Sequence, residues 1–239
     1  PNAGPIVAQP IVAPSVPEPI VPASVAAQHY SLEEYRALEV RSEMRHEYQN
    51  GVIQPMPGGT PNHNRITGIL YARLLMGLVG QPFEPFITDM RVWIPNHQKG
   101  AYPDIFVVQK PLELNPSCDR EALNPTLIAE VLSDSTEAYD RGKKFLYYQS
   151  IPSFREYLLM SQTEVFITRY FKSDDQQWHL WTYTDLGGTI RLDSLGLEIP
   201  LSEIYGAIDL ATTTAPAATT IAAPDNNPPD NNPDSEGQP

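Results

Sequence analysis

Two short apolar segments of the sequence each carry one acidic residue. Residues 102–108 contain Asp104 and residues 125–133 contain Glu130, and most of the other residues in both segments are apolar. Such runs are typical of strands that are buried on both faces of a sheet. A carboxylate there is costly to bury unless a cation or hydrogen bonds compensate it. Because strands consecutive in the chain tend to be neighbours, Asp104 and Glu130 could together bind one hard metal ion.

The alternative is that each carboxylate lies at a strand end, in water or paired with an arginine. A third candidate is Lys144, which shares a face with Asp140 on the helix expected at 136–149. If that helix packs back over the preceding strand, Lys144 could reach Glu130 and stabilise charge that develops on a phosphate. The alternative for Lys144 is a surface ion pair with Asp140, worth a few tenths of a kcal/mol.

Glu47 and His63 are supporting candidates. Glu47 precedes the turn signal Asn50-Gly51, and His63 lies in the first turn of the second expected helix. Either side chain could add a metal ligand or orient a water molecule, although a lone histidine near a helix start is more often exposed or a cap. The sequence has no Cys/His cluster with zinc spacing and no Gly-x-Ser-x-Gly motif.

The elements that must position these residues follow from periodicity and turn signals. Their predicted order is a helix at 30–40 capped by Ser31, a hairpin at 46–56, a helix at 62–79, a strand at 86–94, the two acid-bearing strands separated by a surface loop at 109–124, a helix capped by Asp134, antiparallel strands at 155–160, 165–171, 178–183 and 189–192, and a short helix at 202–205. Over 62–160 the order α-β-β-β-α-β predicts an α/β sandwich.

Composition divides the 239 residues into three parts. Residues 1–28 are Pro-rich and predicted to be a disordered arm, although their Val and Ile could contact a protein partner. Residues 29–208 are expected to form one domain. Residues 209–239, first Thr/Ala-rich and then Pro/Asp/Asn-rich, are predicted to be a disordered tail.

The chain is acidic, with a net charge of -13. Residues 30–206 hold all 16 Lys and Arg and 23 of the Asp and Glu, about -7, which argues against a tight, non-specific nucleic-acid binder. A basic patch or a bound divalent cation could offset that charge locally. The single cysteine, Cys118, excludes an internal disulfide and fits a reducing compartment, so we expect a cytoplasmic protein. We find no bilayer-spanning apolar run and no secretory signal pattern.

The segment from Tyr30 to Tyr205 resembles the Uma-type putative restriction endonucleases, a group of the PD-(D/E)XK nuclease superfamily once described as a domain of unknown function. Seven short segments carry the resemblance: 30–35 (YSLEEY), 47–51 (EYQNG), 63–66 (HNRI), 103–105 (PDI), 130–133 (EVLS), 140–144 (DRGKK) and 151–157 (IPSFREY). Each is weak alone, and their order and spacing supply the specificity.

The resemblance implies a restriction-endonuclease-like fold with a mixed sheet flanked by helices, and hydrolysis of DNA phosphodiester bonds that depends on Mg²⁺ or Mn²⁺. It implies that Asp104 and Glu130 bind the metal. The family pattern has a lysine two residues after the glutamate, where this chain has Leu132, so Lys144 on the following helix becomes the candidate. Glu47 and His63 would support the site, and cleavage of both strands would suit a homodimer.

Two other functions stay open at this stage. The first is a catalytically inactive module on the same fold that binds protein or DNA, which the acidic core and the missing strand lysine suggest. The second is an unrelated surface-exposed structural protein, which only the Pro-rich ends suggest.

Overall fold

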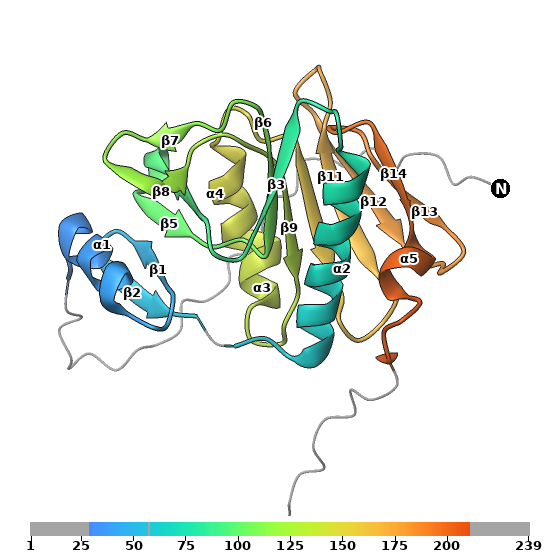
Figure 1. Ribbon diagram of the computed structural model, residues 1–239, viewed down its shortest axis with the longest axis horizontal. Coiled ribbons are helices and arrows are strands. Elements are labelled where there is room, and N and C mark those ends of the chain that lie inside the picture. The colour runs from blue at the N-terminus through green and yellow to red at the C-terminus, as the bar shows by residue number, and fades with distance from the viewer. Residues whose placement is uncertain (1–28, 57, 211–239) are drawn as a thin grey trace, which may run out of the picture.

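The computed structural model describes residues 29–56 and 58–210 (Figure 1). The Pro-rich segment 1–28 lies outside the described residues, as does the tail from 211 onward. Within the described part of the chain, no helix has the length and the apolar character that crossing a bilayer requires.

A six-stranded mixed sheet forms the centre of the fold, in the spatial order β12-β11-β10-β9-β6-β3. Its strands are β3 (Phe83–Ile87), β6 (Ile105–Gln109), β9 (Pro125–Val131), β10 (Glu156–Met160), β11 (Ile167–Lys172) and β12 (Trp178–Tyr183). In this sheet β9 and β10 pair in parallel, and the other neighbours are antiparallel. A helical segment joins the parallel pair, as a crossover must. The predicted αβββαβ order is therefore present, starting from α2 (Pro61–Gly77).

Both faces of this sheet are covered. On one face lie α2, the hairpin of β13 (Thr189–Leu192) and β14 (Leu197–Pro200), and α5 (Leu201–Tyr205), whose apolar side chains pack in one cluster with Ile105 and Val107 of β6. On the other face, the helical segment 137–149 packs in a cluster with Phe106 and Val108. Because side chains of a strand alternate between faces, covering both faces requires apolar residues at nearly every position of β6 and β9.

A second mixed sheet lies beside the first, at the end of the molecule that carries α1 (Leu32–Arg41) (Figure 1). Its strands, in spatial order, are β2 (Val52–Pro55), β1 (His46–Gln49), β5 (Lys99–Ala101), β4 (Arg91–Ile94), β8 (Cys118–Ala122) and β7 (Leu114–Asn115), with a 3-10 turn at Pro95–His97. The N-terminal helix and hairpin agree with the sequence. Ser31 and Glu34 form the predicted capping box, and Asn50 and Gly51 adopt φ of 46° and 88° in the turn.

Two strand predictions were wrong. The predicted strand at 86–94 is two strands, β3 and β4, which belong to different sheets. The chain turns between them at Thr88, which adopts a φ of 43°. A positive φ is unusual for a β-branched residue, so a threonine in an alternating segment did not indicate a turn. The predicted loop at 109–124 contains β7 and β8, which pair with each other at the end of the second sheet. Their residues are mostly polar and range from exposed, as at Asp119 and Arg120, to fully buried, as at Glu121.

The third predicted helix also differs in its start and its form. It begins at Glu137 and not at Asp134, because backbone hydrogen bonds from Thr136 and Glu137 to the carbonyl of Ser133 make a turn first. It consists of α3 (Glu137–Tyr139), a π-helical turn (Asp140–Lys144) and α4 (Phe145–Gln149). The sequence also missed β14. Strand β10 is antiparallel to β11, as predicted, but it is parallel to β9, which was not predicted.

Candidate active site

Asp104 and Glu130 lie side by side in the central sheet. Strands β6 and β9 are antiparallel with Ile105 opposite Ala129, so Asp104, which immediately precedes β6, falls opposite Glu130. The backbone N–H of Asp104 donates to Oε2 of Glu130 at 3.4 Å, and Oδ2 of Asp104 accepts from the N–H of Val131 at 2.7 Å. The two carboxylates therefore converge at the carboxyl end of β9.

Lys144 reaches this pair from the helical segment that covers the sheet. Its Nζ lies 2.8 Å from Oε1 of Glu130, 3.3 Å from Oδ1 of Asp140 and 3.7 Å from Oε1 of Glu47. Tyr148, one turn further on, donates its hydroxyl to the same Oε1 of Glu130 at 3.0 Å. Lys144 is the last residue of the π-helical turn, a feature that occurs often at functional sites.

Glu47 joins the site from the second sheet, with a partner that the sequence analysis missed. Lys99 of β5 lies beside Glu47 of β1, with its Nζ 2.7 Å from Oε2 of the carboxylate. The Lys99 ammonium is 5.4 Å and 5.9 Å from the ring centroids of Tyr139 and Tyr147, a cation–π arrangement. Lys99 is only 1% exposed. No local pattern separates it from an ordinary surface lysine, because its partner is 52 residues away in the chain.

His63 lies against Asp104. Thr60 caps α2 by accepting a hydrogen bond from the His63 backbone N–H at 3.1 Å, and this fixes the first turn of the helix. His63 Nε2 is 3.2 Å from Oδ2 of Asp104. Burial lowers the pKa of His63, but the hydrogen bond and charge of Asp104 outweigh burial and raise it above its ordinary value. All five residues suggested by the sequence are thus brought into one place.

The carboxylates of the site differ in their ionisation. Burial raises the pKa of Glu130 to about 8, against the attraction of Lys144 and with the help of the charges on Asp140 and Asp104. Burial also raises the pKa of Glu47, but the nearby ammonium groups of Lys144 and Lys99 outweigh it, and the net shift is downward. Glu130 therefore keeps its proton to a higher pH than an ordinary carboxyl group, and a further cation beside it would lower its pKa.

A cavity of about 480 Å³ opens over the candidate residues. Its walls come from the end of β2, the loop at 58–60 and the turn at 133–136, and its floor includes Asp104, Glu130 and Lys144. Asp140 Oδ1 is buried there and has no hydrogen bond within the described residues, although Lys144 lies close enough to balance its charge.

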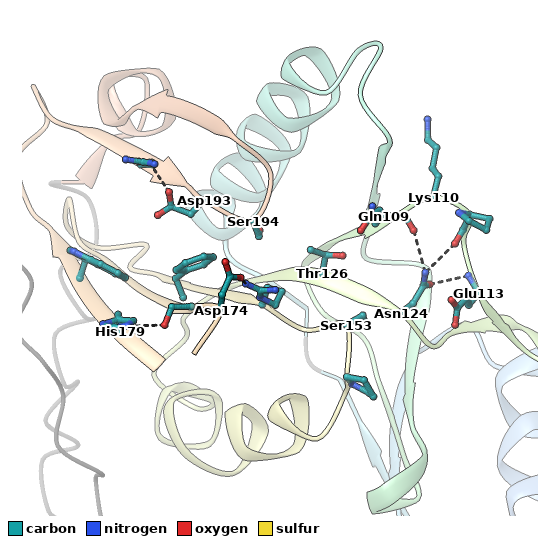
Figure 2. A pocket seen from close by; sticks show the side chains of 17 residues that line it. Gln109, Lys110, Glu113, Asn124, Thr126, Ser153, Asp174, His179, Asp193 and Ser194 are labelled. Carbon is teal, nitrogen blue, oxygen red and sulfur yellow. Dashed lines mark hydrogen bonds and ion pairs between the residues drawn. The ribbon is translucent and has the colours of Figure 1, made fainter. Parts of the chain in front are cut away.

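A larger cavity, about 960 Å³, lies at the opposite end of the central sheet, where β9 and β10 begin (Figure 2). Two of its cations are already paired with carboxylates: Arg155 contacts Asp174 at 2.8 Å and Arg191 contacts Asp193 at 2.6 Å. It contains none of the residues suggested by the sequence. We therefore place the candidate site in the smaller cavity, where unlike charges are not matched one to one.

The donor set of that smaller cavity fits a hard divalent cation. Its lining contains Lys144 and the carboxyl groups of Glu47, Asp104, Glu130 and Asp140, and Lys99, which is outside the lining, contacts Glu47. Mg²⁺ is commonly held by one or two carboxylates and completes its coordination with water. The described residues contain no group of three or more His, Cys, Asp or Glu arranged to hold a metal, so Asp104 and Glu130 would provide the protein's share.

Comparison with known proteins identifies the family of this chain. Residues 32–202 match the model of the Uma2 family, described as putative restriction endonuclease. Two proteins of Synechocystis sp. (strain ATCC 27184 / PCC 6803 / Kazusa) are similar, and both are described as uncharacterized. The protein slr1290 is 38% identical over 73% of this chain and 90% of its own length, and sll1609 is 36% identical over 62% and 83%.

The fold has a solved counterpart. A putative nuclease belonging to DUF820 from Anabaena variabilis ATCC 29413 superimposes with a TM-score of 0.61, covering 74% of this chain and 98% of that one. At 16% identity this likeness concerns the fold alone. The family match, in contrast, spans most of the described residues and every candidate site residue. The chain therefore belongs to the Uma2 family of putative restriction endonucleases.

Proposed function

We propose that this protein is an endonuclease that requires Mg²⁺ or Mn²⁺ and hydrolyses phosphodiester bonds in DNA. One observation carries the proposal: Asp104 and Glu130 converge from adjacent strands, and Lys144 Nζ lies 2.8 Å from Glu130. Two carboxylates suit a hard cation, and an ammonium group beside them suits a phosphate. Family membership supports the same class of reaction.

Each residue has a role that its contacts suggest. Asp104 and Glu130 hold the divalent cation, which when bound supplies positive charge to the phosphodiester and activates water for attack. Lys144 donates to a non-bridging phosphate oxygen as negative charge develops there. Tyr148 orients the Glu130 carboxylate through its 3.0 Å hydrogen bond. His63 orients Asp104 from 3.2 Å and, with its raised pKa, supplies a proton donor beside the phosphate.

Nicking of supercoiled plasmid in Mg²⁺ or Mn²⁺ tests the proposal. We expect cleavage by the wild type, none in EDTA, and a loss of at least about a hundredfold in Asp104→Ala, because one of two metal-binding carboxylates is gone. Asp174→Ala is the matched control: Asp174 is an exposed acid in the other cavity, and its loss should leave cleavage unchanged. Equal nicking by wild type and Asp104→Ala would mean a contaminating nuclease and would overturn the proposal.

The second candidate is a catalytically inactive nuclease-fold module that binds protein or DNA. The observation in its favour is that Lys144 is already engaged by carboxylates of the site, at 2.8 Å and 3.3 Å. Calorimetric titration with Mg²⁺ separates the two candidates. An active site should bind the ion in the wild type and lose it in Glu130→Gln, whereas an inactive module should bind it in neither protein.

We further propose that residues 29–208 act as one cytoplasmic domain, and that two copies combine when both DNA strands are cut. Cleavage of a duplex at one position needs two such sites, which supports a homodimer, and the single Cys118 fits a reducing compartment. The Pro-rich arm at 1–28 is the segment we assign to contact with a protein partner. Light scattering with and without a DNA duplex tests the dimer: a mass that stays that of one chain would overturn it.

A further inference from the structure

Lys99 is a buried cation to which the proposed chemistry assigns no task. Its ammonium contacts Oε2 of Glu47 at 2.7 Å, while the other oxygen of the same carboxylate, Oε1, is 3.7 Å from Lys144. Glu47 therefore stands between two lysines, one on each side. Of these two lysines, Lys144 is the one that also contacts Glu130.

The distances indicate how Lys144 divides its contacts. At 2.8 Å it makes a hydrogen-bonded ion pair with Glu130, and at 3.7 Å it is only loosely associated with Glu47. A buried carboxylate without a partner is strongly unfavourable, so Glu47 would take the nearest available cation if Lys99 were absent. That cation is Lys144, and we expect its shift toward Glu47 to lengthen its 2.8 Å contact with Glu130.

We propose that Lys99 is a positioning residue for Lys144: by neutralising Glu47 it keeps the Lys144 ammonium on Glu130, where the reaction requires it. This inference rests on the proposed nuclease function. The rings of Tyr139 and Tyr147 flank the Lys99 ammonium and keep it directed at Glu47. Lys99 itself is separated from the metal-binding pair by Glu47 and does not contact DNA.

Kinetics of Lys99→Met test this role. A misplacement of about 1 Å in a catalytic group can cost about a hundredfold in rate, so we expect kcat to fall by about tenfold to a hundredfold with the KM for DNA unchanged. The decisive comparison is Glu47→Gln against Lys99→Met/Glu47→Gln. Without charge on Glu47 there is nothing to attract Lys144, so adding Lys99→Met should change kcat by less than about twofold.

The alternative is that Lys99 matters only for packing between the two tyrosine rings. In that case Lys99→Met would lower kcat by the same factor in the wild-type and the Glu47→Gln backgrounds, and such a result would overturn the proposal. If Lys99→Met alone does not fold, a large fall in kcat from Glu47→Gln to the double variant would still overturn the proposal. Arg169→Met is the matched control, because it breaks a buried ion pair with Glu156 away from the site and should spare kcat.

Crystal structures of Lys99→Met and of the double variant supply a readout that needs no catalysis. We expect Lys144 Nζ to leave Glu130 for Glu47 in the single variant and to remain on Glu130 in the double variant. Lys144 still 2.8 Å from Glu130 in Lys99→Met, as in the wild type, would refute the positioning role even if the protein cuts DNA. If the wild type cuts no DNA but the ammonium moves as expected, the nuclease proposal fails and the assignment of Lys99 stands.

Discussion

Replacing Glu130 by glutamine should stabilise the metal-free protein at alkaline pH. The pKa of Glu130 is raised from 4.5 to about 8, chiefly by burial. A carboxyl group with a higher pKa in the folded state binds its proton more tightly there than in the unfolded chain. Its contribution to stability is therefore complete below about pH 4.5 and is lost as the pH rises through 8.

The size of the effect follows from that shift. One unit of pKa corresponds to about 1.4 kcal/mol, so the full shift is worth up to about 5 kcal/mol at pH 9. The pKa of about 8 already includes the attraction of Lys144, but the glutamine amide does not reproduce every contact of the protonated carboxyl group, which reduces the gain. We take the net gain as about 2 kcal/mol, or about 4–8 °C in Tm for a domain of this size.

Thermal melts of wild type and Glu130→Gln between about pH 5 and pH 9, without divalent ions, test this reasoning. The variant should match the wild type near pH 5 and exceed it near pH 9, and Mg²⁺ should raise the Tm of the wild type only. Glu121→Gln is the control, since that buried carboxylate is paired with Arg36 and Arg91 and its loss should destabilise at pH 9. A Glu130→Gln protein less stable than wild type at pH 9 would show that the Lys144 pair outweighs burial.

Three further outcomes are expected. Lys144→Met should lower kcat for plasmid nicking by about 10²–10³-fold while calorimetric Mg²⁺ binding persists, since a preorganised donor is lost but both metal-binding carboxylates remain; lost Mg²⁺ binding would contradict this. Thr60→Ala should cost about 1 kcal/mol in urea unfolding, because the His63 N–H loses its cap; an unchanged midpoint would argue against the cap. Leu70→Ala should cost about 2–5 kcal/mol in the same assay, because this side chain is 1% exposed in the core. A cost below about 1 kcal/mol would mean that neighbouring side chains move to fill the cavity left by the substitution.

The proximity of Asp104 and Glu130 could be predicted from the sequence, because each is an acid in an apolar run. An acid in a run of apolar residues is informative, because burial restricts where such a side chain can lie. The register of β6 against β9 could not be predicted, because it depends on how the two strands pair, and the sequence shows only the pattern of each strand alone. The αβββαβ order followed because both sheet faces are covered, which makes β6 and β9 almost continuously apolar, and because the apolar residues of α2 have helical spacing.

The features that the sequence missed have in common that they depend on distant contacts. Buried Lys99 is paired with Glu47 of the same sheet and lies over the rings of Tyr139 and Tyr147, all distant from it in the chain. Strand β7 lies at the edge of the second sheet and β8 lies next to it, so several of their polar side chains reach solvent. The turn at Thr88 depends on a backbone hydrogen bond from its N–H to the Asp104 carbonyl at 3.1 Å. Local propensity does not encode any of these, because each is stabilised by tertiary structure that overrides it.

Leu132 bears on the proposal that Lys144, on the helical segment, takes the place of a lysine on the strand. The resemblance implies a lysine at this position, two residues after Glu130. Here Leu132 is buried in the apolar cluster that contains Phe145 and Tyr148 of α4. Leu132 therefore packs in one cluster with α4, and the π-helical turn that precedes α4 contains Lys144. An ammonium group at the same carboxylate can thus be delivered from the covering helix, provided that the helix is held against the strand by apolar contact.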